Sequence, residues 1–327
     1  MSDRAATAGP APLGRLIAAF AAVYVLWGST YLGIRFSMET LPAFFTQGVR
    51  FMTAGVVTYA WARRHGAAPP ARREWAGGAL AGVLLFVCGT GGVVWAERLI
   101  PSGVAALVVA TEPASFVLIE AVRRRRFPRG AILAGLTLGA AGLAILVGPG
   151  DLIGGDRFAP SALLVLVAGT FCWASGSLYS RGSRLPESPW MATAVTLVCG
   201  GAGLAVIGAL SGELARFDPA AVSAKSLWAT LYLFVFGSLV GFSAYLWLLR
   251  NASIARVSTY AYVNPVVAVV LGWALAGEPL TPRVGLATAV IVGAVALIIR
   301  HGGEDAEIVR PDEADLGCEK APETLHA

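Results

Sequence analysis

Charged residues are scarce in this chain of 327 residues. Asp, Glu, Lys and Arg make up 14% of it, whereas hydrophobic residues make up 56% and the mean hydropathy is +0.68. A water-soluble domain of this length cannot cover so much apolar side-chain surface with its own fold. The composition therefore excludes an ordinary soluble protein and predicts an integral membrane protein whose surface is covered by lipid.

Histidine and lysine are scarcer still, and their positions exclude several kinds of chemistry. None lies in a zinc-binding spacing or a glycine-lysine phosphate loop: the positions are His65, His301, His326, Lys225 and Lys320. Metal catalysis and direct ATP drive are therefore not expected. We predict that the chain is not an enzyme and carries no cofactor and no metal.

Cysteine is also rare, and no disulfide framework is predicted, because three of the four cysteines lie in apolar runs and the fourth in a polar tail: Cys88, Cys172, Cys199 and Cys318. The net charge of +5 comes from arginines in short turns between apolar runs. Such arginines are typical of topology signals rather than of a nucleic-acid surface.

Long apolar runs are what the chain has instead. A helix needs about 20 apolar residues to cross the roughly 30 Å of hydrocarbon in a bilayer. Ten such spans are predicted, at Leu16–Ile34, Pro42–Ala62, Gly77–Trp95, Ser102–Val122, Ala131–Gly148, Ala162–Ser180, Pro189–Leu210, Leu227–Leu249, Val257–Ala276 and Val284–Ile299. The fold class is therefore an all-α membrane protein of ten transmembrane helices.

Arginine placement predicts the orientation. Arginines concentrate in the turns after the second, fourth, sixth and eighth spans, as in Arg63-Arg64 and Arg123 to Arg126. By the positive-inside rule both termini are then cytoplasmic in a bacterial inner membrane. We predict a cytoplasmic segment 1–15, a periplasmic linker 149–161, and a disordered acidic cytoplasmic tail 301–327.

The chain also repeats itself. Trp27-Gly-Ser-Thr-Tyr-Leu-Gly-Ile-Arg35 matches Trp173-Ala-Ser-Gly-Ser-Leu-Tyr-Ser-Arg181, with Trp, Ser, Leu and Arg in register. In a longer match at one constant offset, four residues of the first half pair with four of the second: Gly89 with Gly241, Trp95 with Trp247, Arg98 with Arg250 and Pro113 with Pro265. Two five-helix units follow, 16–148 and 162–300, and an odd number of spans inverts the second. Inverted repeats are typical of alternating-access carriers.

At these residues the sequence resembles the drug/metabolite transporter superfamily and, within it, the ten-helix EamA-type exporters. The resemblance covers roughly Leu16 to Arg300 and rests on Trp27-Gly28, Pro42, Arg50-Phe51, Pro101-Ser102, Ala105-Ala106, Pro113, Trp173, Ser258 and Asn264-Pro265. The sequence departs from this pattern at Ala174, where the first repeat has Gly28, and in the seventh span, which has no counterpart of Arg50. The resemblance implies export of amino acids or other metabolites, driven by a proton or substrate gradient.

Aromatic and polar residues within the spans are candidates for a substrate-binding wall. Tyr24, Trp27 and Tyr31 form one stripe of the first helix, with Ser29 beside it. The repeat-related Trp173, Ser175 and Tyr179 lie on the sixth, and Tyr260 and Asn264 are one turn apart on the ninth. Rings and hydroxyls of this kind fit a cavity wall, whereas the alternative interpretation is helix packing or interfacial anchoring.

Glu112 is the sharpest single candidate. It lies midway along the fourth span beside Pro113, where a carboxylate is costly unless it is neutral, paired or facing water. One interpretation makes it a proton-coupling group, and another pairs it with Arg50. The remaining two are substrate contact and simple exposure to a water-filled vestibule. Arg50 could bind a substrate carboxylate or lock the second helix, and the resemblance implies the locking role, away from the central cavity.

These features predict a secondary active transporter for amino acids or other small metabolites or drugs, exporting by alternating access. The alternatives are a uniporter or exchanger, a channel-like facilitator, and, with less support, a receptor or a membrane enzyme. The expected partners are a small-molecule substrate and the lipid bilayer, with no nucleic acid, and the chain is expected to be a monomer or homodimer.

Overall fold

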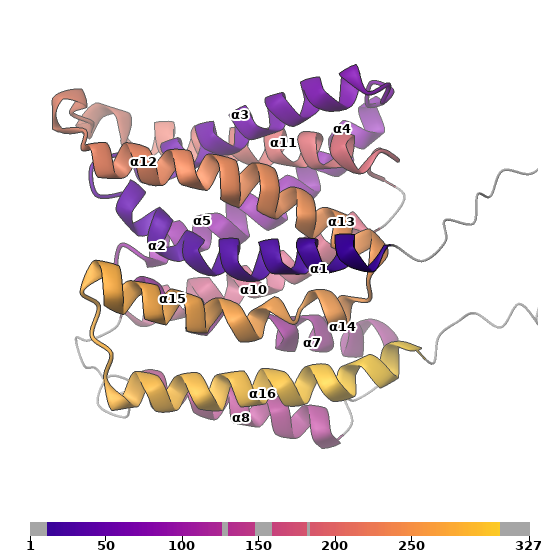
Figure 1. Cartoon of the computed structure of the whole chain (residues 1–327), viewed down its shortest axis with the longest axis vertical. Coiled ribbons are helices and arrows are strands. Elements are labelled where there is room, and N and C mark those ends of the chain that lie inside the picture. Colours follow the sequence, from indigo (N-terminus) through magenta and orange to yellow (C-terminus); the bar gives the residue numbers. More distant parts are fainter. Residues whose placement is uncertain (1–11, 126–129, 148–158, 182–183, 308–327) are drawn as a thin grey trace, which may run out of the picture.

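The structure is a computed structural model that describes residues 12–125, 130–147, 159–181 and 184–307. All regular secondary structure in these ranges is helical. The helices run side by side along a common direction (Figure 1). α1 begins and α16 ends at one end of the bundle, here called the α1 end, whereas α2 and α15 finish at the other, here called the α2 end (Figure 1).

The elements follow the predicted spans closely. In the first half they are α1 (Leu13–Ala21), η1 (Ala22–Leu26), α2 (Trp27–Ser37), α3 (Ala43–Arg64), α4 (Arg72–Gly82), η2 (Val83–Thr90), α5 (Gly91–Ala96), α6 (Ser102–Val109), α7 (Glu112–Arg124) and α8 (Gly130–Val147). In the second half they are α10 (Pro160–Ser180), α11 (Pro189–Leu210), η3 (Leu214–Arg216), η4 (Pro219–Ala221), α12 (Ala224–Tyr232), η5 (Leu233–Phe242), α13 (Ser243–Asn251), α14 (Ile254–Val257), α15 (Tyr260–Ala276) and α16 (Pro282–Glu307).

Many of these helical segments can cross a membrane. Within the described residues, six are long and apolar enough: Leu13–Ser37, Arg72–Ala96, Ser102–Arg123, Pro160–Ser180, Pro189–Leu210 and Ala224–Asn251. Three shorter apolar helices accompany them, Gly130–Leu146, Val263–Ala276 and Pro282–Ile298. α3 is 22 residues long but more polar, because it carries Gln47 and Arg50. The chain is therefore a multi-pass membrane protein.

Glycines let the helices pack closely. A Cβ on Gly48 of α3 would lie 2.3 Å from the backbone nitrogen of Ala205 on α11, and one on Gly208 would lie 2.4 Å from that of Phe45. Small residues allow such contacts where lipid gives helices no hydrophobic drive to associate. α3, α4 and α11 form one side of the bundle, and α8 packs against α16 on the opposite side (Figure 1).

Three segments are π-helical rather than α-helical, namely η1, η2 and η5. π-helical turns widen the helix and often occur at functional sites. The apolar pattern did not predict them, because a run of five to ten residues is too short for its apolar period to distinguish the two kinds of helix. η2 contains Gly89 and η5 contains Gly241, which the sequence repeat pairs with each other.

The structure differs from the prediction at two chain regions. The ninth span was expected from Val257, but α14 ends there and α15 starts at Tyr260. α16 continues to Glu307, into the segment expected to be a disordered tail. Residues 1–11, 148–158 and 308–327, which include most of the predicted terminal segment, linker and tail, lie outside the described residues.

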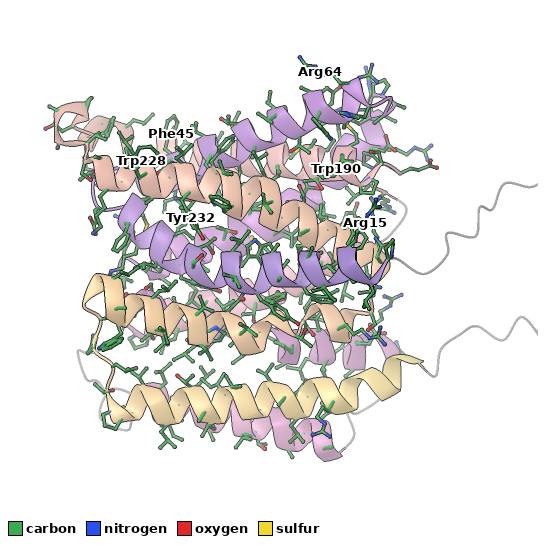
Figure 2. The ribbon with its side chains drawn as sticks, viewed as in Figure 1. Arg15, Phe45, Arg64, Trp190, Trp228 and Tyr232 are labelled. Atoms are coloured by element: carbon green, nitrogen blue, oxygen red, sulfur yellow. The ribbon has the colours of Figure 1, made fainter. Side chains whose placement is uncertain are left out.

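Tryptophans are exposed near both ends of the bundle. Trp228 on α12 lies toward the α2 end and Trp190 on α11 toward the α1 end (Figure 2), with exposed fractions of 69% and 48%. Tryptophan favours the interface between lipid and water because its ring is apolar and its N–H is polar. Arg15 and Arg64 both lie toward the α1 end (Figure 2).

Candidate functional site

A cavity of about 110 Å³ lies inside the bundle. Both halves of the chain line it, through α2, α3, η2, α5, α6, α7, α10, η5 and α15. Seven of the residues predicted from the sequence are on its wall: Trp27, Tyr31, Arg50, Glu112, Trp173, Tyr260 and Asn264. The structure thus brings together side chains that are far apart in the sequence.

Aromatic rings form one wall of the cavity. Trp27 packs edge-on against Trp173, with ring centroids 5.5 Å apart, and against Tyr260 at 5.6 Å. Its ring also lies 4.8 Å from that of Tyr245. The Trp27 indole N–H donates a hydrogen bond to the Gly237 carbonyl at 3.3 Å, which fixes the ring orientation. Trp27 and Trp173, paired in the sequence repeat, are therefore in direct contact.

Glu112 provides the carboxyl group of the cavity. The helix of the fourth span breaks at Ala110 and Thr111, and Glu112 is the first residue of α7. Its side chain is 2% exposed, and Oε2 accepts a hydrogen bond from the Tyr260 hydroxyl at 2.5 Å. Within the described chain Oε1 has no partner, and neither has Oδ1 of Asn264, one turn after Tyr260. Two buried oxygen acceptors are thus left for a proton or a ligand donor.

Arg50 also lies on the cavity wall, whereas the resemblance implied a position away from it. The guanidinium donates to the Leu233 carbonyl at 3.0 Å and lies 4.0 Å from the centre of the Phe51 ring. The described residues include no ion pair between Arg50 and Glu112. Leu233 starts η5, where the π-helical register leaves its carbonyl able to accept this bond. The sequence could not predict this contact, because it joins two halves.

Four other predicted residues are not on the wall of this cavity. The Tyr24 and Thr259 hydroxyls form a short hydrogen bond. Ser29 bonds with the Tyr232 hydroxyl, on the side of α2 facing α12. Ser175 and Tyr179 are partly buried on α10. Tyr24 and Ser29 thus contact neighbouring helices through their hydroxyls.

The model of the EamA-like transporter family matches the chain twice, over residues 14–148 and 160–300. This chain belongs to the EamA-like transporter family. It is therefore a membrane transporter of small molecules and not an enzyme. Within the residues that the structure describes, no group of histidine, cysteine or carboxylate side chains could bind a metal ion.

Known proteins similar to this EamA-like transporter include an uncharacterised inner membrane transporter, YedA, of Escherichia coli K12. It is 38% identical over 86% of this chain and 90% of its own length. A probable terminal-alkyne amino-acid exporter of Streptantibioticus cattleyicolor is 26% identical over 88% of this chain and 95% of its own. A protein of known crystal structure shares the fold, with a TM-score of 0.59, 21% identity, and coverage of 87% of this chain and 96% of that one.

Sequence analysis missed one central aromatic residue of the transporter, Tyr245 on α13. It is fully buried, and its hydroxyl contacts the Trp173 indole N–H at 3.1 Å and the Ser177 hydroxyl at 2.6 Å. The repeat gave a usable signal, since Tyr245 lies between Gly241 and Trp247, both of which have counterparts in the first half.

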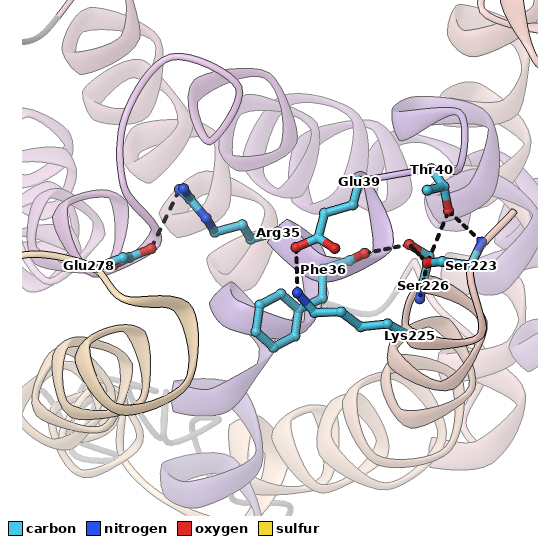
Figure 3. A network of polar contacts seen from close by, with 8 residues as sticks. All are labelled: Arg35, Phe36, Glu39, Thr40, Ser223, Lys225, Ser226 and Glu278. Carbon is cyan, nitrogen blue, oxygen red and sulfur yellow. Dashed lines mark hydrogen bonds and ion pairs between the residues drawn. The ribbon is translucent and has the colours of Figure 1, made fainter. Parts of the chain in front are cut away.

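A polar network lies at the α2 end of the transporter (Figure 3). On one side, Lys225 of α12 pairs with Glu39 at 2.6 Å, and the Ser226 hydroxyl donates to the Phe36 carbonyl at 2.8 Å. On the other side, Arg35 of α2 lies 3.5 Å from Oε1 of Glu278, in the turn after α15. The end of α2 is thus attached to both α12 and the turn between α15 and α16.

Proposed function

We propose that this chain is a secondary active transporter of the bacterial inner membrane that exports small metabolites carrying an ammonium group, including amino acids, by alternating access. The observation that carries the proposal is the cavity between the two sequence repeats, where repeat-related Trp27 and Trp173 meet beside the buried carboxyl group of Glu112. A site at the boundary of two repeats is what rocking of one half against the other requires.

The packing of elements supports an inverted repeat of 16–148 and 162–300. α3 packs against its own counterpart α11, and α8 against its counterpart α16. α2 contacts α15, and its counterpart α10 contacts α6 and α7, which correspond to α15. In the same way, α2 contacts α12, and α10 contacts α4, which corresponds to α12. Such an exchange of partners is expected of two units related by a twofold axis. The six long apolar helices, the three shorter ones and α3 make ten segments, and the proposal takes these as the ten membrane spans.

The chemistry of the cavity supports an ammonium group on the substrate. Aromatic ring faces attract cations, and an unpaired carboxylate oxygen accepts hydrogen bonds from an ammonium. Trp27, Tyr260 and Glu112 offer both features in one cluster, in which the Tyr260 ring packs against Trp27 and the Tyr260 hydroxyl donates to Glu112. The Arg50 guanidinium, elsewhere on the same wall, suits a substrate carboxylate. A zwitterionic amino acid combines the two groups, and one relative carries the name of an amino-acid exporter.

Glu112 is the proposed site of proton coupling. A carboxyl group that accepts either a proton or an ammonium binds only one of them at a time, so its occupancy links the two fluxes. The Tyr260 hydroxyl stabilises the charged form, and burial favours the neutral one. Both forms therefore have structural support in this cavity.

The arginine distribution supports cytoplasmic termini. Arg15 precedes most of the first span, Arg64 ends the second, and both lie toward the α1 end of the bundle (Figure 2). Cytoplasmic loops carry an excess of Arg and Lys. The α1 end is then cytoplasmic and the α2 end periplasmic.

Transport in proteoliposomes tests this function, with a panel of radiolabelled amino acids and an imposed pH gradient. The Glu112→Gln variant should lose gradient-driven transport but keep exchange of substrate for substrate, because Gln cannot exchange a proton. The matched control is Glu187→Gln, an exposed glutamate outside both the cavity and the polar network at the α2 end, which should behave like the natural chain. Driven transport that survives Glu112→Gln would contradict proton coupling at this residue. Flux without saturation or counterflow would contradict the carrier and identify a channel.

A further inference from the structure

A second buried carboxyl group lies outside the cavity, at the α2 end. Glu97 follows α5 directly and is 5% exposed. Neither of its carboxylate oxygens has a hydrogen-bond partner in the described part of the chain. A buried carboxylate with no partner is strongly unfavourable, and a carboxylic acid in the same place is much less so. The transport mechanism above does not use Glu97.

The neighbouring Glu278, in contrast, is fully occupied. Its Oε1 accepts hydrogen bonds from the Ser102 backbone N–H at 2.9 Å and from the Ser102 hydroxyl at 2.7 Å, and Oε2 accepts from the Gly103 N–H at 3.1 Å. It thus caps the first turn of α6, where backbone donors and the helix dipole favour a negative charge. Arg35 adds a cation 3.5 Å from Oε1.

The titratable groups near Glu97 belong to two other elements. Arg35 and Tyr31 are on α2, and Glu278 is in the turn after α15. The adjoining Arg98 is exposed. Burial and the Glu278 carboxylate raise the pKa of Glu97 well above its ordinary value, and Arg35 opposes this shift.

Two other cations at this end have partners of their own, and Arg98, next to Glu97, is exposed. At the start of α16, Arg283 donates to the Ile145 carbonyl at 2.8 Å. Lys225 is paired with Glu39 on the α12 side of α2 (Figure 3). Arg35 is therefore the cation whose charge Glu97 and Glu278 share.

We propose that Glu97 is a second proton-binding site of this transporter, and that loss of its proton draws Arg35 away from Glu278. The proton leaves to water, and no covalent bond other than O–H is broken. The carboxylate left behind is a buried charge without a partner, and Arg35 is the cation able to reach it. Because Glu278 keeps its hydrogen bonds to Ser102 and Gly103, it can release Arg35 at less cost than Glu97 can remain unpaired.

The consequence is a pH-sensitive latch on α2. α2 carries Trp27 and Tyr31 of the cavity wall, and Arg35 is in its last turn. When Arg35 leaves Glu278, α2 loses its ion pair to the turn after α15 but keeps its contacts with α12 (Figure 3). Because the pKa of Glu97 is raised here, the latched conformation is stable at low pH and loses stability as the pH rises through that raised value.

Protonation of Glu97 can be measured without any substrate, by infrared difference spectra of the purified protein in lipid nanodiscs during a pH titration. The natural chain should show the carbonyl band of a protonated buried carboxyl group at neutral pH, and Glu97→Gln should lose one component of it. Glu39→Gln, an exposed glutamate at the same end, should keep all components. A spectrum of Glu97→Gln identical to that of the natural chain would overturn the inference.

The latch itself is tested by the labelling rate of a cysteine at Ile34, on the cavity side of α2, in a background without the four native cysteines. Labelling by a maleimide in nanodiscs should accelerate severalfold as the pH rises. In Glu97→Gln it should stay slow at every pH, and in Arg35→Gln it should be fast at every pH. A pH response that persists in Glu97→Gln overturns the latch. The latch rests on the proposed carrier function only for its role in transport. If Glu112→Gln loses driven transport while Glu97→Gln leaves the pH dependence of labelling unchanged, the latch alone is refuted.

Discussion

At the scale of single residues, the cavity joins one carboxyl group to a cluster of aromatic rings. Glu112, Tyr260 and Asn264 form its polar corner, where two oxygen acceptors have no partner in the described chain. Trp27 and Trp173 enclose that corner with apolar surface. A small cation therefore finds charge, hydrogen-bond acceptors and ring faces together, which is the basis of the proposed preference for ammonium groups.

Trp27 gives the residue-scale prediction. Replacement of Trp27 by Ala removes the ring that contacts Trp173, Tyr245 and Tyr260. Substrate affinity should fall about thirtyfold, because a desolvated cation–π contact contributes about 2 kcal/mol. Trp27→Phe, which keeps a ring, should lose less. Equilibrium binding of the transported amino acid measures both, and equal loss of folded protein in the two variants would favour a packing role instead.

The residues that sequence reasoning placed in the cavity share one property: each is unusual for its local context. Glu112 is a carboxylate in an apolar run, and Trp27 and Trp173 recur in a repeat. Arg50 and Tyr245 were harder to place, because their roles depend on contacts with Leu233 and with Ser177 across the bundle. A single sequence carries no direct record of such contacts.

At the scale of elements, the bundle depends on the close contact of α3 with α11. Gly48 of α3 faces Gly201 and Ala205 of α11, and Gly55 faces Ala194 and Val198, at distances that leave no room for a side chain. In this pair, the second span of one repeat packs against the second span of the other. We expect it to act as a fixed axis while the helices around the cavity move.

The element-scale prediction concerns Gly48. Replacement by Ala would place a Cβ about 2.3 Å from the Ala205 backbone nitrogen, so the helices must separate. The free energy of unfolding should fall by roughly 1–3 kcal/mol, the usual cost of overpacking. The matched control is Gly285→Ala on α16, where no atom lies within 4 Å of an added Cβ. Thermal unfolding in detergent compares the two, and an equal midpoint for both variants would contradict the close contact.

The spans were predictable because bilayer thickness and helix rise fix the length of an apolar run. The interruptions within them were not. η2 and η5 differ from α-helix by one residue in hydrogen-bond register, and the break before Glu112 joins two segments of similar hydropathy. Both features depend on backbone hydrogen bonding, which hydropathy does not measure.

At the scale of the whole molecule, the two halves contribute jointly to the cavity and to both ends of the bundle. Arg35 and Arg181 occupy matching positions in the sequence repeat, and they lie at opposite ends of the bundle. Arg35 contacts Glu278, and Arg181 donates to the Ala252 carbonyl at 3.1 Å. The proposal of alternating access requires that one of these ends opens as the other closes.

Distances between spin labels at the two ends test this claim most directly. One pair joins Glu39 to Leu280 at the α2 end, and the other joins Val122 to Arg184 at the α1 end, each introduced as cysteines in a background without native cysteines. On raising the pH in nanodiscs, the account predicts that the first distance lengthens while the second shortens. Distances that change in the same direction would contradict alternating access, and distances that do not change at all would contradict the pH-sensitive latch.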